Sequence, residues 1–63
     1  MSIVYDGYKI EIYVADQIQM VFVFDTKNDD EIVVVDNWEF GIDTTYRQII
    51  AYVVKEINKI VPV

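Results

Sequence analysis

Acidic side chains crowd one short stretch of this chain, between two strongly apolar segments. Asp25, Asp29, Asp30 and Glu31 stand close together in the sequence, and carboxylate oxygens are ligands that Ca²⁺ and Mg²⁺ prefer. The spacing does not fit an EF-hand, because Lys27 stands where a ligand is needed and no glycine follows at the sharp turn. We therefore interpret the cluster as a solvated turn whose charge is available to a partner, and we expect no metal and no cofactor.

Other catalytic chemistry finds little support in the composition. The 63-residue chain contains no His and no Cys, so it lacks the commonest general base, the thiolate nucleophile and the usual soft metal ligands. No Ser/His/Asp or Cys/His set can form, and no glycine-rich loop is present that would cradle a phosphate. We predict a protein that is not an enzyme and that has no catalytic residues.

The charge balance restricts the partners. Eleven acidic residues against five basic ones give a net charge of −6. Direct nucleic-acid binding needs a basic surface, and anionic membranes attract basic segments, so neither partner is expected. No apolar run approaches the ~18 residues of a membrane span, and no signal-peptide pattern is visible. The sequence indicates one cytoplasmic domain over residues 1–63.

The first two-thirds of the chain have the pattern of antiparallel strands. Residues 8–14 alternate between apolar and polar side chains, residues 18–25 and 31–36 are two further strand-like runs, and turn residues separate the three. Asp6-Gly7 suits a two-residue hairpin turn, which would make residues 2–5 a short extra strand. We prefer the competing interpretation, one long strand with a bulge at the glycine, because so short a run makes a poor strand partner.

Residues 46–60 show the periodicity of a helix. Apolar side chains recur at i, i+3, i+4 and i+7, and Pro62 ends the pattern. Thr45 followed by Gln48 has the form of a capping box. Together these patterns predict an α+β fold, in which a three-stranded antiparallel meander packs one face against a single C-terminal helix.

A single helix leaves the other face of such a sheet uncovered. We expect the larger side chains of residues 18–25 to face the helix, because they fill the gap between sheet and helix. The predicted core is Tyr8, Ile10, Ile12, Met20, Phe22, Phe24, Ile32 and Val34 against Tyr46, Ile49, Ile50, Val53, Val54 and Ile57. The predicted uncovered patch is Tyr13, Val21, Val23, Val33 and Val35. A slip of one residue in register would exchange the two faces.

An apolar patch on a small domain favours self-association, with two sheets stacked face to face as a homodimer. The alternatives are a different partner, a monomer with exposed valines, and pairing through the edge strands. Trp38 and Tyr52 are further candidate contacts, since Trp and Tyr favour binding hot spots. Trp38 and Phe40 equally suit the role of filling the open end of the core.

The acidic loop of Asp25, Asp29, Asp30 and Glu31 suggests a second function. A negatively charged surface fits a basic groove, such as that of a nucleic-acid-handling protein, and would act there as an inhibitor or regulator. In size and charge alone, the chain is similar to small acidic inhibitors from mobile genetic elements, which are viral or prokaryotic. It carries no motif of any family, so homodimeric assembly without inhibition is the alternative.

Overall fold

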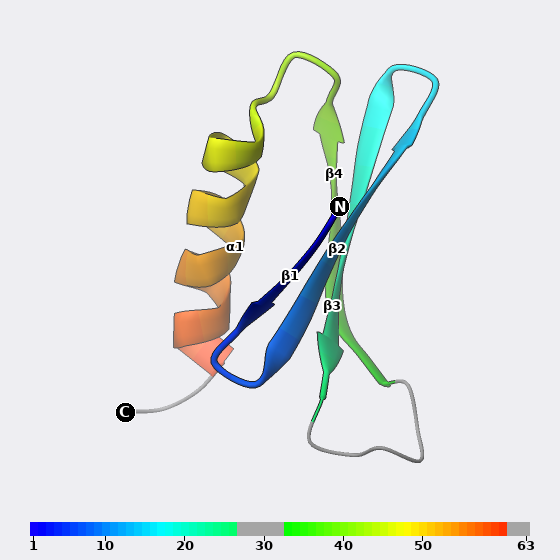
Figure 1. The fold of residues 1–63 in the computed structure, drawn as a ribbon. Coiled ribbons are helices and arrows are strands. Elements are labelled where there is room, and N and C mark those ends of the chain that lie inside the picture. The colour runs from blue at the N-terminus through cyan, green and yellow to red at the C-terminus, as the bar shows by residue number, and fades with distance from the viewer. Residues whose placement is uncertain (27–32, 61–63) are drawn as a thin grey trace.

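The computed structural model of the chain describes residues 1–26 and 33–60, with the backbone alone for Val33 and Ile60. The elements are β1 (Ser2–Tyr5), β2 (Tyr8–Ala15), β3 (Ile18–Asp25), β4 (Val33–Gly41) and α1 (Tyr46–Ile60). The strands form one antiparallel sheet in the order β1-β2-β3-β4, and α1 lies along one face of it (Figure 1). The predicted α+β class with a C-terminal helix is confirmed, but the described residues form four strands instead of the predicted three.

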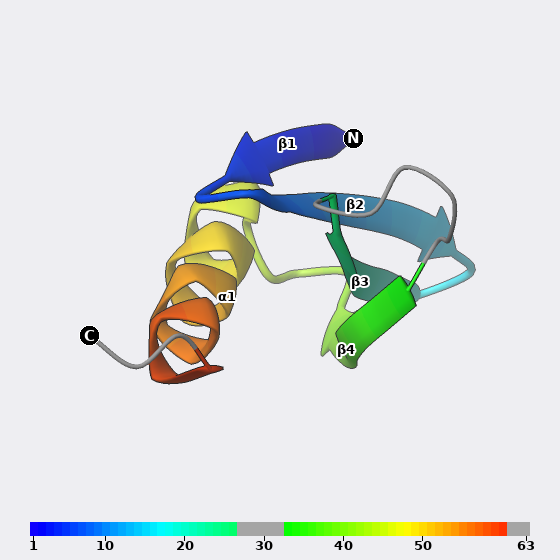
Figure 2. The ribbon, with the colours of Figure 1, turned by 90° about the horizontal axis from the view of Figure 1, so that it is seen from below.

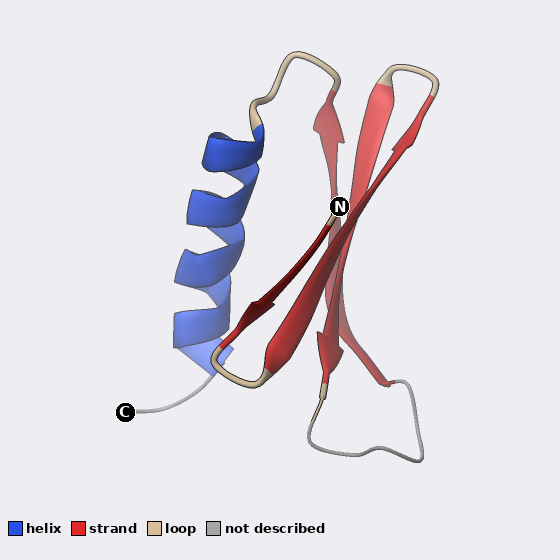
Figure 3. Cartoon of the chain, in the orientation of Figure 1, coloured by secondary structure: helices blue, strands red, loops and turns tan. Residues whose placement is uncertain are grey.

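The additional strand comes from the hairpin at the N-terminus (Figure 3). Asp6 and Gly7 both have positive φ, 49° and 79°, and Tyr5 pairs with Tyr8 directly across them. Two successive residues at positive φ match the twist of a two-residue hairpin, and Asp-Gly is a favoured pair for it. The preferred interpretation of one long bulged strand is therefore wrong, and the hairpin alternative is correct.

A second two-residue turn sets the register between β2 and β3. Asp16 adopts a φ of 56° in this turn, and Ala15 pairs with Ile18 across it. The same register places Ile12 opposite Val21. Residues directly opposite each other in an antiparallel pair point to the same face of the sheet. The valines of β3 therefore share a face with the isoleucines of β2.

The core lies between that face and α1. It consists of Tyr8, Ile10, Ile12, Val21, Val23, Ile49, Val53 and Ile57. Partly buried side chains pack against it, namely Tyr5, Val35, Trp38, Phe40 and Ile50. The predicted isoleucines of β2 and the predicted Ile49, Val53 and Ile57 of α1 are confirmed at its centre. Tyr46, which is 47% exposed, and the half-buried Val54 do not belong to this core, so their assignment was wrong. The assignment of Met20, Phe22 and Phe24 to this core is wrong, because they alternate with the buried valines along β3.

The loop length explains the wrong face. Our interpretation counted Ala15 as part of a three-residue connection, which would pair Ile12 with Met20. The turn has two residues, so Ile12 pairs with Val21 instead. Because side chains alternate along a strand, this difference of one residue exchanges the two faces of β3.

A bulge rearranges the strand that follows. Val23 pairs with Asp36, whereas Phe24 pairs with Val34, so Val35 is an additional residue in β4. A bulge of this kind redirects side chains and strengthens the local twist. Val35 packs against the core and Val34 is 46% exposed, which is the reverse of our prediction. The predicted core residue Ile32 lies outside the described residues.

The start of α1 is capped as predicted. The Gln48 backbone N–H donates to Oγ1 of Thr45 over 3.2 Å, and the Thr45 backbone N–H donates to Oε1 of Gln48 over 3.0 Å. This reciprocal pair is a capping box, and it satisfies two backbone donors at the helix end.

Of the helices among the described residues, none is both long and apolar enough to span a membrane.

Candidate functional site: the open face of the sheet

The sheet face turned away from α1 has no described element over it (Figure 2). Apolar side chains gather there, and we call the five around Phe22 the open-face cluster: Tyr13 of β2, Met20, Phe22 and Phe24 of β3, and Val34 of β4. By register, the exposed Val4 of β1 and Ile18 of β3 lie on the same face, farther from Phe22. Tyr13 is 50% exposed and Val34 46% exposed, and the three side chains of β3 are half-buried. Three members of the open-face cluster are therefore aromatic, and they lie next to one another across β2 and β3.

The aromatic rings of the open-face cluster form a continuous row. The centroid of the Phe22 ring lies 5.9 Å from the centroid of the Tyr13 ring, in an edge-to-face arrangement. It lies 6.3 Å from the centroid of the Phe24 ring, in a stacked arrangement. Aromatic pairs in such geometries contribute about 0.5–1.5 kcal/mol beyond the area they bury. The rings therefore hold one another in position, and a surface ordered in this way loses less side-chain entropy when it is covered.

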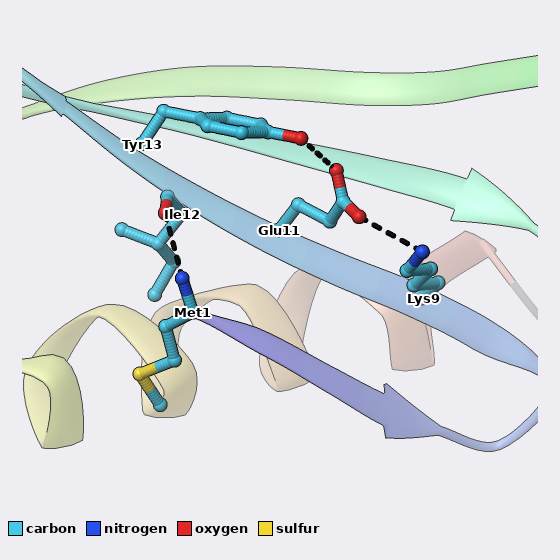
Figure 4. A network of polar contacts seen from close by, with 5 residues as sticks. All are labelled: Met1, Lys9, Glu11, Ile12 and Tyr13. Atoms are coloured by element: carbon cyan, nitrogen blue, oxygen red, sulfur yellow. Dashed lines mark hydrogen bonds and ion pairs between the residues drawn. The ribbon is translucent and has the colours of Figure 1, made fainter.

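A polar network borders the aromatic row along β2. Every second side chain of β2 lies on the open face, among them Lys9, Glu11 and Tyr13. The Glu11 carboxylate contacts the polar groups of the other two (Figure 4). The Lys9 ammonium lies 2.9 Å from Oε1 of Glu11, while the Tyr13 hydroxyl donates to Oε2. The carboxylate thus fixes the phenol end of the exposed Tyr13 ring, which packs against Phe22.

The network shifts the pKa values of all three groups. Hydrogen bonds from Tyr13 and then Lys9 hold the pKa of the Glu11 carboxyl below its usual range. The hydrogen bond to Glu11 raises the pKa of the Tyr13 phenol, with smaller contributions from burial and from the carboxylate charge. The hydrogen bond and charge of Glu11 likewise raise the pKa of the Lys9 ammonium.

We expect Glu11→Gln to lower the pKa of Tyr13 and of Lys9, because both lose the hydrogen bond to the carboxylate, which is the main cause of their raised pKa, and also its charge. The titration is followed for each tyrosine by the ¹³C shift of its phenolic carbon. Tyr52 is the internal reference, because it lies on α1 outside this network. An unchanged Tyr13 titration in the variant would contradict the network.

The same shifts fix how stability depends on pH. Glu11 has a depressed pKa in the folded chain, so its contribution is present above the unfolded pKa and is lost as the pH falls through the folded one. Tyr13 has a raised pKa, so its contribution is present below the unfolded pKa and is lost as the pH rises through the folded one. Glu11→Gln should flatten both ends of the profile.

The predicted self-association patch is divided between the two faces. Tyr13 lies on the open face as predicted. Val21 and Val23 are fully buried in the core, and Val35 packs against that core, so placing these three on an exposed face was wrong. The side chain of Val33 lies outside the described part of the chain. The residues that replace the valines on the open face are Met20, Phe22, Phe24 and Val34.

The predicted acidic contact is described only at its first residue. Asp25 is half-buried at the end of β3. Asp29, Asp30 and Glu31 lie outside the described residues. Within residues 1–26 and 33–60, no three acidic side chains converge in a way that would hold a metal ion.

The two aromatic contact candidates touch each other. The Tyr52 ring of α1 packs edge to face against the rings of Trp38 and Phe40, with centroid distances of 5.8 Å and 5.6 Å. Trp38 and Phe40 are partly buried against the core, and Tyr52 remains 42% exposed. These rings close the side of the core between β4 and α1, so Tyr52 packs against the sheet and does not project freely from the helix.

Sequence reasoning missed Gln19, which lies in β3 on the same face as the buried valines. Its side chain is only 3% exposed, and its Nε2 group donates to the backbone oxygen of Gly41 over 2.9 Å and of Thr44 over 2.8 Å. The amide thereby fastens the β4–α1 loop to the sheet. A correct turn length would have revealed it, since Gln19 alternates with Val21 and Val23.

Comparison with known proteins adds no relative. No protein-family model matches the sequence, and no curated protein or solved structure matches it.

Proposed function

We propose that this chain is a non-enzymatic protein-interaction module that binds its partner through the open-face cluster. One observation carries the proposal: the aromatic row of Tyr13, Phe22 and Phe24 is pre-positioned on a sheet face with no described element over it. Contiguous exposed apolar surface marks interaction sites, and aromatic side chains dominate their binding energy. The absence of His and Cys from the sequence agrees with a binding role.

The test compares two lysine substitutions of exposed aromatic residues. Phe22→Lys places a charge at the centre of the open-face cluster, and Tyr46→Lys places the same charge on α1, where Tyr46 is 47% exposed. Tagged forms are expressed in the source cells, and the proteins that copurify, including untagged copies of this chain, are quantified by mass spectrometry. Recovery should fall at least tenfold with Phe22→Lys and persist with Tyr46→Lys. Equal recovery with both variants would rule out the open face as the binding surface.

A second candidate function follows from the net charge of −6. An acidic chain of this size suits a basic surface on a nucleic-acid-handling protein, which it would inhibit or regulate. Binding of this kind weakens steeply with salt. Reversing the charges of Asp29, Asp30 and Glu31 should then abolish it, whereas Phe22→Lys should have little effect. Salt-insensitive binding to the recovered partner would exclude this candidate.

A further inference from the structure

The charge on the open face differs from that of the whole molecule. By strand register, the charged side chains of the described strands on this face are Lys9, Glu11 and Glu39. One cation and two anions leave a net charge of −1 there, against −6 for the chain, and the cation is already paired with Glu11. A basic partner would be drawn to the rest of the molecule. A nearly neutral apolar face instead suits a partner whose strong negative charge lies away from the contact, such as a second copy of this chain.

The size of the face agrees with a dimer interface. The four strands have 4, 8, 8 and 9 residues, so the plan area of the face is about 460 Å² at ~3.3 Å per residue and ~4.8 Å between strands. Two copies packed together bury about 900 Å², and more where their side chains interdigitate. That value lies near the ~1,000 Å² that separates biological interfaces from weaker contacts.

The arrangement of the open-face cluster also suits a two-fold axis. Phe22 is the middle member of the β3 row, between Met20 and Phe24, and its cross-strand neighbours are Glu11 and Asn37. An isologous interface brings one patch against its own copy, so the residue at the axis meets itself. A large aromatic side chain at the centre of the face is the residue type that carries most of the energy of such contacts.

We infer that the open face binds a second copy of this chain, sheet against sheet, with the two Phe22 side chains meeting at a two-fold axis. This inference rests on the proposed function and names the partner of that surface. Two stacked sheets lie ~10 Å apart, which leaves room for the rings of both copies. Glu11 lies beside Phe22 on β2, and Lys9 of the same copy compensates its charge, so it adds little repulsion between two acidic molecules.

Sedimentation of the purified chain tests the inference directly. The wild type should reach twice the chain mass of 7.4 kDa between micromolar and millimolar concentration. Phe22→Lys should remain a monomer with unchanged far-ultraviolet circular dichroism, and Tyr46→Lys should dimerise like the wild type. Val34→Lys is a second disruptive variant if Phe22→Lys fails to fold, since Val34 is 46% exposed. A wild-type monomer at millimolar concentration, or a folded Phe22→Lys dimer, would overturn the inference.

Chemical cross-linking tests the geometry. The sequence has no Cys, so Asn37→Cys introduces a single thiol next to Phe22 without removing any member of the open-face cluster. A two-fold axis at Phe22 places the two thiols about 10–14 Å apart, from the ~10 Å sheet separation and the ~4.8 Å strand spacing. A bis-maleimide of that span should give a covalent dimer with Asn37→Cys and none with Lys55→Cys on α1. Equal cross-linking at both positions would contradict the geometry.

Sedimentation and copurification together distinguish a failure of the inference from a failure of the proposed function. A wild-type monomer that still recovers other proteins in a Phe22-dependent way would refute the second copy as partner and keep the open face as the binding surface. A monomer whose recovered proteins do not depend on Phe22 would refute both. A dimer that Phe22→Lys dissociates would support both.

Discussion

Val23→Lys is expected to unfold the chain, whereas Phe22→Lys, one position earlier in β3, is expected to leave it folded. Val23 is fully buried in the core and pairs with Ile10 of β2. A buried lysine without a partner shifts its pKa by up to about 3–5 units, which costs about 4–7 kcal/mol at 1.36 kcal/mol per unit. A chain of 63 residues has only about 3–9 kcal/mol of stability at ~0.05–0.15 kcal/mol per residue.

Urea denaturation followed by Trp38 fluorescence measures the difference between the two variants. Phe22→Lys should retain a cooperative transition, because the half-buried Phe22 side chain lies on the open face and a lysine there can extend into water. Val23→Lys should show no folded baseline at neutral pH. If both variants unfold to the same extent, the assignment of the two faces of β3 is wrong.

The strand faces show where sequence patterns stop being sufficient. Both sets of alternating side chains in β3, Met20-Phe22-Phe24 and Val21-Val23, are apolar, so hydrophobicity does not say which one faces the helix. The decision belongs to the turn before the strand, where Asp16 adopts positive φ in a two-residue loop. Loop length fixes register, and register fixes the face. Side-chain size, on which our prediction relied, was the weaker argument.

The helix and its cap were predictable for the opposite reason. The apolar stripe of α1 has polar residues on its other face, so its period identifies both the element and the buried side. Ile49, Val53 and Ile57 are accordingly buried, and the capping box of Thr45 and Gln48 forms as predicted. Local chemistry specifies these features without help from the rest of the chain.

The sequence predicted that the candidate site is an open face of the sheet, but it predicted only some of the residues on that face. A helix that covers one face of a sheet necessarily leaves the other face open, and this follows from the number of elements alone. The identity of the exposed side chains depends on the turn between β2 and β3 and on the bulge at Val35, neither of which the apolar pattern reveals. Tyr13 was correctly placed because β2 alternates cleanly, with Lys9 and Glu11 marking its wet face.

Gln19→Glu is expected to destabilise the chain by about 3 kcal/mol or more at neutral pH, although the side chain keeps its size. The Gln19 amide donates to the backbone oxygens of Gly41 and Thr44 and is almost fully buried. A carboxylate has no hydrogen to donate, so it would face two acceptor oxygens while losing its own hydration. Leaving a buried polar group unsatisfied costs about 1–3 kcal/mol, and more when the group is charged.

The pH dependence of Gln19→Glu distinguishes this cause from a simple packing defect. Burial against carbonyl oxygens favours the protonated acid, so the folded pKa of the new side chain should lie above its unfolded value. The variant should therefore be most stable below the unfolded pKa, where the acid hydroxyl donates to one carbonyl, and should lose stability as the pH rises through the folded pKa. Gln17→Glu in the exposed turn is the matched control and should change stability by less than about 0.5 kcal/mol. Urea denaturation at several pH values measures both variants. A loss in Gln19→Glu that does not vary with pH would show that the buried amide does not act by donating to the β4–α1 loop.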